Sequence, residues 1–390
     1  MATWMANLSS PLCSNCSGEL LDDMRGSDFS GGSGGGEENV YHISAEYYVN
    51  GVAVPFICLL GVIGNLLNIA ILTWRSWRRE DDSLEKVALV GLIALAASDM
   101  CFCLALLPNF SYWEPQSLYP SRSFALYFRL YGGYVHNVFI KTSTWLTMIV
   151  ATARYVVICH PLRARMCFGL LPTKIAIMFT FIFWVLFLSP MLWSFTYYDY
   201  PTGNVTEYVM DLGEFNNNHA LNKTFNCLWT VFGYFIPVAI LAFCNVCLIL
   251  ALRESRLLRE SVAVGRSYSN ASRKCNRRIT ITLVALVMMF MLLVSPSELI
   301  HFCQTINKNE FVAIELGILV TNVLQATNVA FHFVLYCAVN VSFRRTLFNL
   351  MYMLVSLLRT SRLKRTRRKD SFSHRSTFIH SALRSNETHI

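Results

Sequence analysis

Charged side chains within long apolar segments are the residues of this chain with the most distinctive chemistry. Asp99, Lys141 and Glu298 each lie inside such a segment. An ionised group at membrane depth costs about 2.5–3.5 kcal/mol on insertion scales, so it is usually paired or functional. For Lys141 and Glu298 two interpretations stay open. They form a structural ion pair, or they lie in or under an outward-facing pocket where Glu298 anchors a cationic ligand group.

A second group of polar residues lies at similar depth in other apolar segments. Asp99 is joined by Ser143 and Asn328, and His332 follows Asn328 by one helical turn. One interpretation is that these residues, together with Asn65, form a polar, hydrated centre that holds a small cation. An interhelical hydrogen-bond network without an ion, which also includes Asn65, is the equal alternative.

The composition indicates that membrane-spanning helices position these residues. Of the 390 residues, 54% are hydrophobic and only 15% are charged, and the mean hydropathy is +0.42. Soluble domains carry about a quarter charged residues. Continuous apolar runs without period-two alternation favour helices over barrel strands. Seven spans are predicted, at 49–74, 86–108, 126–158, 174–196, 228–252, 277–303 and 312–337.

The distribution of charge predicts how these spans are oriented. Lys and Arg are concentrated in 74–86, 159–174, 252–278 and the segment after 344, whereas the opposite connections are acidic. The positive-inside rule therefore places the N-terminus outside and the C-terminus in the cytoplasm. The net charge of +9 follows from this asymmetry and does not indicate nucleic-acid binding. Glycosylation sequons on the outer side agree, at Asn7, Asn15, Asn109, Asn204 and Asn222.

The predicted fold is all-α, a seven-transmembrane helix bundle with a short amphipathic cytoplasmic helix. Residues 1–48 form a flexible, glycosylated extracellular tail, and residues 49–340 form the bundle. Residues 341–357 form the amphipathic helix on the membrane surface. Residues 358–390 form a basic tail with phosphorylatable Ser and Thr, which suits anionic lipids and an arrestin-like partner.

Several short motifs occur together at spacings that resemble the rhodopsin-like G-protein-coupled receptors. The resemblance covers about residues 48–357 and implies a plasma-membrane receptor that binds a ligand outside and activates a heterotrimeric G protein inside. It implies coupling roles for Arg154, Tyr155 and Tyr336, and it matches Asp99, Ser143 and Asn328 to sodium-site positions. The motifs are Gly64-Asn65, Leu95 with Asp99, Ala153-Arg154-Tyr155, Trp184, Pro237, Pro296, and Tyr336 with Phe343.

Within that family the chain is similar to invertebrate FMRFamide-type neuropeptide receptors, in segments 159–167, 189–193 and 331–337. It also departs from the family pattern. Ala153 replaces an acidic residue, the Cys-Trp pair before Pro296 is absent, and His332 replaces an asparagine. Arg129 occupies the place of a cysteine that normally pairs with the second outer loop. A disulfide from Cys227 therefore has Cys13, Cys16 or Cys303 as its candidate partner.

The residues expected to contact the ligand lie at the outer ends and in the outer halves of the spans. Acidic outer segments and Glu298 favour a basic or amidated peptide, and His136 stands where amine receptors carry aspartate. The expected ligand-binding residues are Trp113, His136, Asn137, Lys141, Glu298 and His301.

Two other classes of protein were weighed against a receptor. A transporter or channel would use Asp99, Lys141 and Glu298 as an ion path, but the sequence has no internal repeat. An enzyme is not expected, because the motifs HExxH, GxSxG and GxxxxGK[ST] do not occur. No metal site is expected either, since the CxxC spacing of Cys13 and Cys16 has no partner pair.

Overall fold

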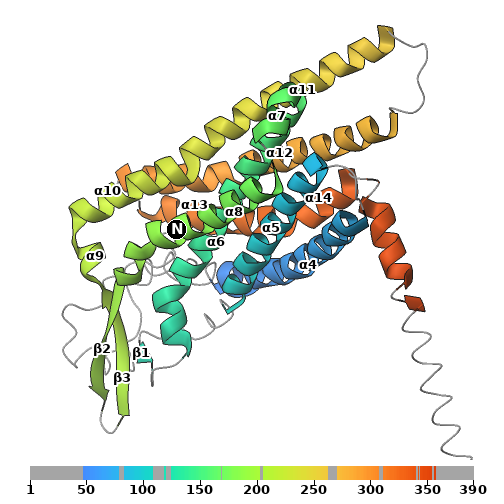
Figure 1. The fold of residues 1–390 in the computed structure, drawn as a ribbon. Coiled ribbons are helices and arrows are strands. Elements are labelled where there is room, and N and C mark those ends of the chain that lie inside the picture. Colours follow the sequence, from blue (N-terminus) through green and yellow to red (C-terminus); the bar gives the residue numbers. More distant parts are fainter. Residues whose placement is uncertain are drawn as a thin grey trace, which may run out of the picture. The chain divides into compact units, whose positions relative to one another are not determined.

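A computed structural model gives the fold of the chain, which divides into two compact units, Met1–Val339 and Asn340–Ile390. In the first unit, helices lie alongside one another and a small antiparallel sheet is present (Figure 1). The structure describes residues 47–78, 83–108, 118–119, 124–167, 169–202, 205–261, 270–306, 311–339, 341, 343–353 and 355–356.

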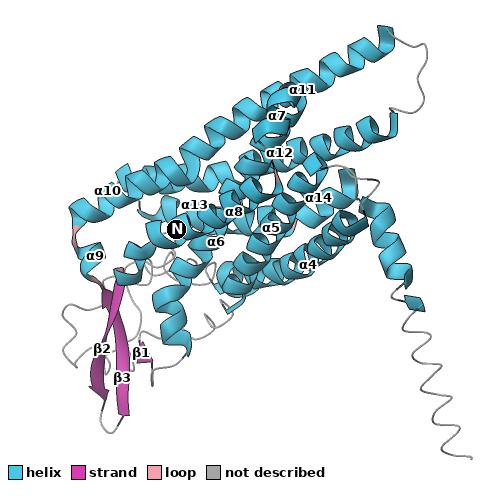
Figure 2. Cartoon of the chain, viewed as in Figure 1, coloured by secondary structure: helices cyan, strands magenta, loops and turns pink. Residues whose placement is uncertain are grey.

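Each of the seven predicted spans coincides with helical structure, as Figure 2 shows by colour. A π-helical segment, Tyr47–Ala53, precedes the first α-helix. Phe331 lies in a turn that divides the seventh span in two. The α-helices of the spans are α4 (Val54–Arg78), α5 (Ser83–Leu106), α6 (Phe124–Cys159), α8 (Leu170–Phe187), α11 (Ile236–Ser261), α12 (Asn270–Ile306), α13 (Phe311–Ala330) and α14 (His332–Val339).

The described helices have the length and the surface of membrane spans. Five stretches are long and apolar enough to cross a bilayer: Tyr48–Trp77, Glu85–Leu106, Leu126–Cys159, Leu170–Trp193 and His219–Ala251. A shorter apolar stretch, Val284–Ile300, lies within α12. Large apolar side chains point away from the bundle, among them Phe56, Met178 and Leu292. A surface of this kind requires lipid rather than water around it.

The fifth span is longer than predicted. The helix α10 (His219–Thr230) leads into a π-helical segment, η4 (Val231–Phe235), and then into α11. Asn218 caps α10, because its Oδ1 accepts a hydrogen bond from the Leu221 N–H at 3.1 Å. Helical structure therefore begins nine residues before the predicted start at Leu228.

Two short helices in the connections lie outside the predicted spans, and a third forms the outer end of the fourth span. The segment Pro161–Cys167 forms α7 on the predicted cytoplasmic side. The 3₁₀ helix η3 (Ser189–Trp193) follows α8, and α9 (Glu214–Asn217) precedes α10.

A three-stranded sheet in the outer connections was not predicted. Its strands are β1 (Leu118–Tyr119), β2 (Phe195–Thr202) and β3 (Val205–Leu212), in the order β1-β3-β2. Both pairings are antiparallel. Apolar residues of the hairpin pack on the first turns of α6, where Leu126 and Leu130 meet Phe195, Tyr197 and Met210. The hairpin therefore depends on a surface that lies far from it in the sequence.

The second unit contains the predicted amphipathic segment. Residues 343–353 are helical, and Phe348, Met351 and Tyr352 are exposed. An exposed apolar face of this kind is compatible with a helix on a membrane surface, which stays a prediction.

Candidate functional site

The structure brings Lys141 and Glu298 together in the interior of the bundle. Lys141 comes from α6 and Glu298 from α12, and the Lys141 Nζ donates a hydrogen bond to the Glu298 Oε1 at 2.7 Å. Lys141 is 1% exposed and Glu298 is 7% exposed. Each charge offsets the desolvation cost of the other, because neither group reaches bulk solvent.

The fifth span supplies the space that Lys141 needs. A Cβ at Gly233 would lie 3.2 Å from the Cδ, Cε and Nζ atoms of Lys141, so a larger residue would press on the lysine. Gly233 belongs to the π-helical segment η4, and the indole N–H of Trp145 in α6 donates to the Phe232 carbonyl at 3.0 Å. The Lys141 Nζ also lies 5.0 Å from the centre of the Trp229 ring, a cation–π distance.

His136 and Asn137 are buried in α6, one turn before Lys141. The Asn137 Nδ2 donates to the Gly133 carbonyl at 2.7 Å, and the His136 ring lies edge-on to Phe102 of α5. The Asn137 amide therefore bonds to its own helix, whereas the His136 ring contacts a neighbouring helix. Of the other predicted ligand-binding residues, Trp113 and the side chain of His301 lie outside the described residues.

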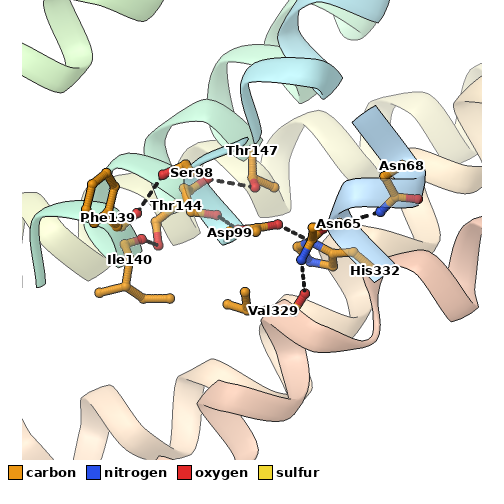
Figure 3. A network of polar contacts seen from close by, with 11 residues as sticks. Asn65, Asn68, Ser98, Asp99, Phe139, Ile140, Thr144, Thr147, Val329 and His332 are labelled. Carbon is orange, nitrogen blue, oxygen red and sulfur yellow. Dashed lines mark hydrogen bonds and ion pairs between the residues drawn. The ribbon is translucent and has the colours of Figure 1, made fainter. Parts of the chain in front are cut away.

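Asp99 is the centre of a second polar cluster, shown in Figure 3. It is fully buried in α5. The Ser143 Oγ of α6 donates to the Asp99 Oδ1, and the His332 Nδ1 of α14 lies 2.6 Å from the Asp99 Oδ2. These contacts bring α5, α6 and α14 together at one carboxylate.

Neighbouring hydrogen bonds extend this cluster to α4 and α13 (Figure 3). The Asn65 Nδ2 of α4 donates to the Val329 carbonyl of α13 at 3.2 Å, and the Asn68 Nδ2 donates to the Asn65 Oδ1. The Ser98 Oγ of α5 donates to the Phe139 carbonyl of α6 at 2.9 Å. The described contacts form an interhelical hydrogen-bond network, one of the two alternatives left open by the sequence.

Two of the predicted sodium-site residues, Asp99 and Ser143, contact each other directly in this structure. Both carboxylate oxygens have protein partners, and the imidazole of His332 lies against one of them. Asn328 is buried, and its Oδ1 has no hydrogen-bond partner among the described residues. His332 was not among the predicted sodium-site residues, although its spacing from Asn328 placed it on the same helical face. Sodium binding at Asp99, Ser143 and Asn328 therefore stays a prediction.

The predicted coupling residues lie towards the inner end of the bundle. Arg154 of α6 is 2% exposed, and Tyr336 of α14 is 4% exposed. The Tyr155 hydroxyl and the His160 Nε2 lie 3.2 Å apart, and the Tyr155 ring packs edge-on against Phe243 of α11. Arg154 and Tyr336 are therefore covered by other helices.

Two outer features bear on the predicted glycan and disulfide. The Asn222 Nδ2, the atom to which a glycan would attach, donates to the Asn216 Oδ1 at 3.0 Å. No disulfide joins Cys227 and Cys303 in this structure, and the partner of Cys227 stays a prediction. Their side chains extend from different helices, α10 and α12, and no disulfide geometry joins them.

The other predicted glycosylation sites and candidate disulfide cysteines lie outside the described residues. They are Asn7, Asn15, Asn109, Asn204, Cys13 and Cys16.

Comparison with known proteins defines the class to which this bundle belongs. The chain belongs to the family of serpentine type 7TM GPCR chemoreceptors, Srw, whose profile matches residues 52–353. It is 27% identical to a putative G-protein coupled receptor of Caenorhabditis elegans, over 82% of this chain and 76% of that protein. It is 25% identical to the FMRFamide receptor of Drosophila melanogaster, over 77% of this chain and 53% of that protein.

A further relative is the allatostatin-A receptor of Bombyx mori. The identity is 21%, over 76% of this chain and 78% of the relative. Family membership confirms the seven-helix receptor fold, the multi-pass membrane location and the G-protein-coupled receptor class. The chain is therefore a receptor rather than an enzyme, and the transporter alternative is replaced by this assignment.

Proposed function

We propose that this receptor binds an extracellular neuropeptide that is basic and amidated. The observation that carries the proposal is Glu298, a carboxylate in the interior of the bundle. Its ion-pair partner Lys141 also lies over the aromatic ring of Trp229. A guanidinium group suits a carboxylate, and an aromatic peptide side chain suits an aromatic wall. Relatives named as FMRFamide, galanin-like and allatostatin-A receptors support the same class of ligand.

The proposed ligand site includes Glu298 and Lys141 at its base and His136 and Asn137 one turn away on α6. Trp113 and His301 complete the proposed set at the outer ends of the spans. The acidic residues of the outer connections, such as Glu207 and Asp211, attract a basic peptide before it enters the bundle.

On the cytoplasmic side, Arg154, Tyr155 and Tyr336 are proposed to contact the G protein. Arg154 and Tyr336 are covered in this structure, so the inner ends of the helices must separate before a partner reaches them. Ligand and G protein then favour the same open conformation, which is the condition for coupling between the two sites. The tail, residues 358–390, is proposed to bind anionic lipids and, after phosphorylation, an arrestin-like protein.

A G-protein activation assay tests this function. Cells expressing the receptor and a sensor for each Gα class are challenged with a neuropeptide library in which each peptide is present as the amide and as the free acid. We expect a response to basic amidated peptides at nanomolar to micromolar concentration that the matched free acids do not give. Arg154→Ala is the control, because it should abolish the response while surface expression and peptide binding remain. A response to amines or organic acids instead of peptides would reject the proposal.

A further inference from the structure

Among the described residues, Lys141 contacts both Glu298 and Trp229, whereas Glu298 has Lys141 as its hydrogen-bond partner. The lysine ammonium meets both the Glu298 carboxylate at 2.7 Å and the face of Trp229 at 5.0 Å. If Glu298 left, the ammonium would keep its cation–π contact. If Lys141 left, the carboxylate would lose the cation that neutralises it. A second cation that takes the place of Lys141 beside Glu298 would therefore keep the carboxylate neutralised, at the smallest cost in free energy.

The accessibility of the two residues leads to the same choice. Glu298 is 7% exposed and Lys141 is 1% exposed, so the lysine is the more deeply enclosed member of the pair. Gly233 and Trp229 of the fifth span enclose the lysine. We therefore take Glu298 as the member of the pair that a ligand group contacts.

The position of the pair connects it to movement of α12. Glu298 lies two residues after Pro296, which removes a backbone hydrogen bond from α12 and permits bending there. Before the proline, Phe290 and Val294 of α12 pack with Ala151 of α6 and Leu241 of α11. The ion pair thus holds the outer part of α12 to α6, and the apolar cluster holds the part before the proline.

We propose that the Lys141–Glu298 ion pair keeps the receptor inactive, and that a guanidinium or primary ammonium group of the ligand activates it by replacing Lys141 at Glu298. Only the second half rests on the proposed peptide function. The first half requires only that the chain is a G-protein-coupled receptor. A ligand cation lowers the free energy of the state in which α12 is no longer tied to α6, which is the differential affinity that activation requires.

Basal signalling without ligand tests the first half. We expect Lys141→Met and Glu298→Gln each to raise basal G-protein activation per receptor at the cell surface by about tenfold, within the roughly 5–150-fold range of coupled sites. The double variant Lys141→Met/Glu298→Gln leaves no unpaired buried charge at this position, so we expect it to reach the cell surface even if a single variant does not, and to show the same rise. The reversed pair Lys141→Glu/Glu298→Lys should return basal signalling towards that of the natural receptor.

The matched control is another buried ion pair, Arg75 with Glu85, whose Nη2 and Oε1 atoms lie 3.6 Å apart between α4 and α5. Arg75→Met and Glu85→Gln should leave basal signalling unchanged, because neither residue lies on α12. If the double variant at Lys141 and Glu298 reaches the surface and signals like the natural receptor, the pair does not hold the inactive state and the proposal is overturned.

The second half is tested with Phe-Met-Arg-Phe-amide and other amidated peptides of the library, each paired with an analogue in which neutral citrulline replaces arginine. On the natural receptor the citrulline analogues should be at least tenfold weaker. On Glu298→Gln the two forms should be equally weak, and on Lys141→Met the arginine form should bind more tightly because its competitor is gone. A response that depends on Lys141 and a peptide carboxylate would overturn this half.

The two proposals fail in distinguishable ways. Raised basal signalling in the double variant, with silence of the natural receptor towards every basic amidated peptide, would support the inhibitory ion pair and reject both the peptide function and ligand exchange at Glu298. A peptide response with unchanged basal signalling in the double variant would keep the peptide function and reject the inhibitory pair.

Discussion

At the scale of single residues, the fully buried carboxylate of Asp99 has a protein partner at each of its two oxygens. Asp99 receives Ser143 on one oxygen and lies 2.6 Å from the His332 imidazole on the other. The sequence singled out Asp99, Ser143 and His332 as polar residues at membrane depth. The sequence did not reveal whether a cation or the His332 imidazole lies against the Asp99 carboxylate. Both can bind the same oxygen, and only the three-dimensional positions of the residues decide between them.

The contact with His332 predicts how the receptor responds to sodium. Replacing Na⁺ by N-methylglucamine should leave the melting temperature of the purified receptor unchanged, because both oxygens of Asp99 already have protein partners. His332→Asn should free that oxygen, and Na⁺ should then raise the melting temperature by a few degrees, since about 1 kcal/mol shifts it by about 2–4 °C. The control is Asp99→Asn in the same background, which should remove the sodium effect. A clear sodium effect on the natural receptor would contradict the interpretation of Asp99.

At the scale of elements, the sequence predicted the spans well and their local irregularities poorly. Apolar length and charge placement are properties of one segment, and all seven predicted spans coincide with helices. The hairpin of β2 and β3 contains Asp199, Pro201 and Asp211, whose propensities oppose strands, and it rests on Leu126 and Leu130 of another segment. The π-helical segment η4 likewise depends on another segment, because its Gly233 lies against Lys141 of α6.

The close contact between η4 and Lys141 predicts the effect of a larger residue at Gly233. Gly233→Val places side-chain atoms where the Cδ, Cε and Nζ atoms of Lys141 lie 3.2 Å from an added Cβ. We expect a loss of about 1–3 kcal/mol from overpacking, together with raised basal signalling as the lysine is displaced from Glu298. Gly317→Val is the control, because a Cβ at that position meets only the flexible side chain of Ile300 at the same 3.2 Å.

Thermal stability and basal signalling per surface receptor are the two measurements for these glycine variants. Gly317→Val should lower the stability without raising basal signalling. An equal rise in basal signalling for both variants would show that packing, and not the ion pair, controls it.

At the scale of the whole molecule, the Lys141–Glu298 ion pair and the polar cluster around Asp99 both include residues of α6. Lys141 and Ser143 lie two residues apart on α6, and each contacts a different partner: Lys141 reaches Glu298 of α12, and Ser143 reaches Asp99 of α5. Asp99 in turn contacts His332 of α14, which packs against α12. The sequence indicated these polar residues but not the contacts that link their helices. Lys141 and Glu298 are separated by 157 positions in the sequence, and Asp99 and His332 by 233.

This shared helix predicts that the two centres are energetically coupled. A displacement of α6 after loss of Lys141 also moves Ser143, so the effect of Lys141→Met on basal signalling should depend on whether His332 is present. In the double variant Lys141→Met/His332→Asn, basal signalling should differ from the product of the two single effects by about twofold or more, which corresponds to the low end of the range for coupled residues. Lys141→Met with Arg75→Met is the comparison, and its effects should multiply, because Arg75 belongs to the pair between α4 and α5. If both double variants show simple multiplication, the two centres act independently, and the ion pair controls α12 without the cluster around Asp99.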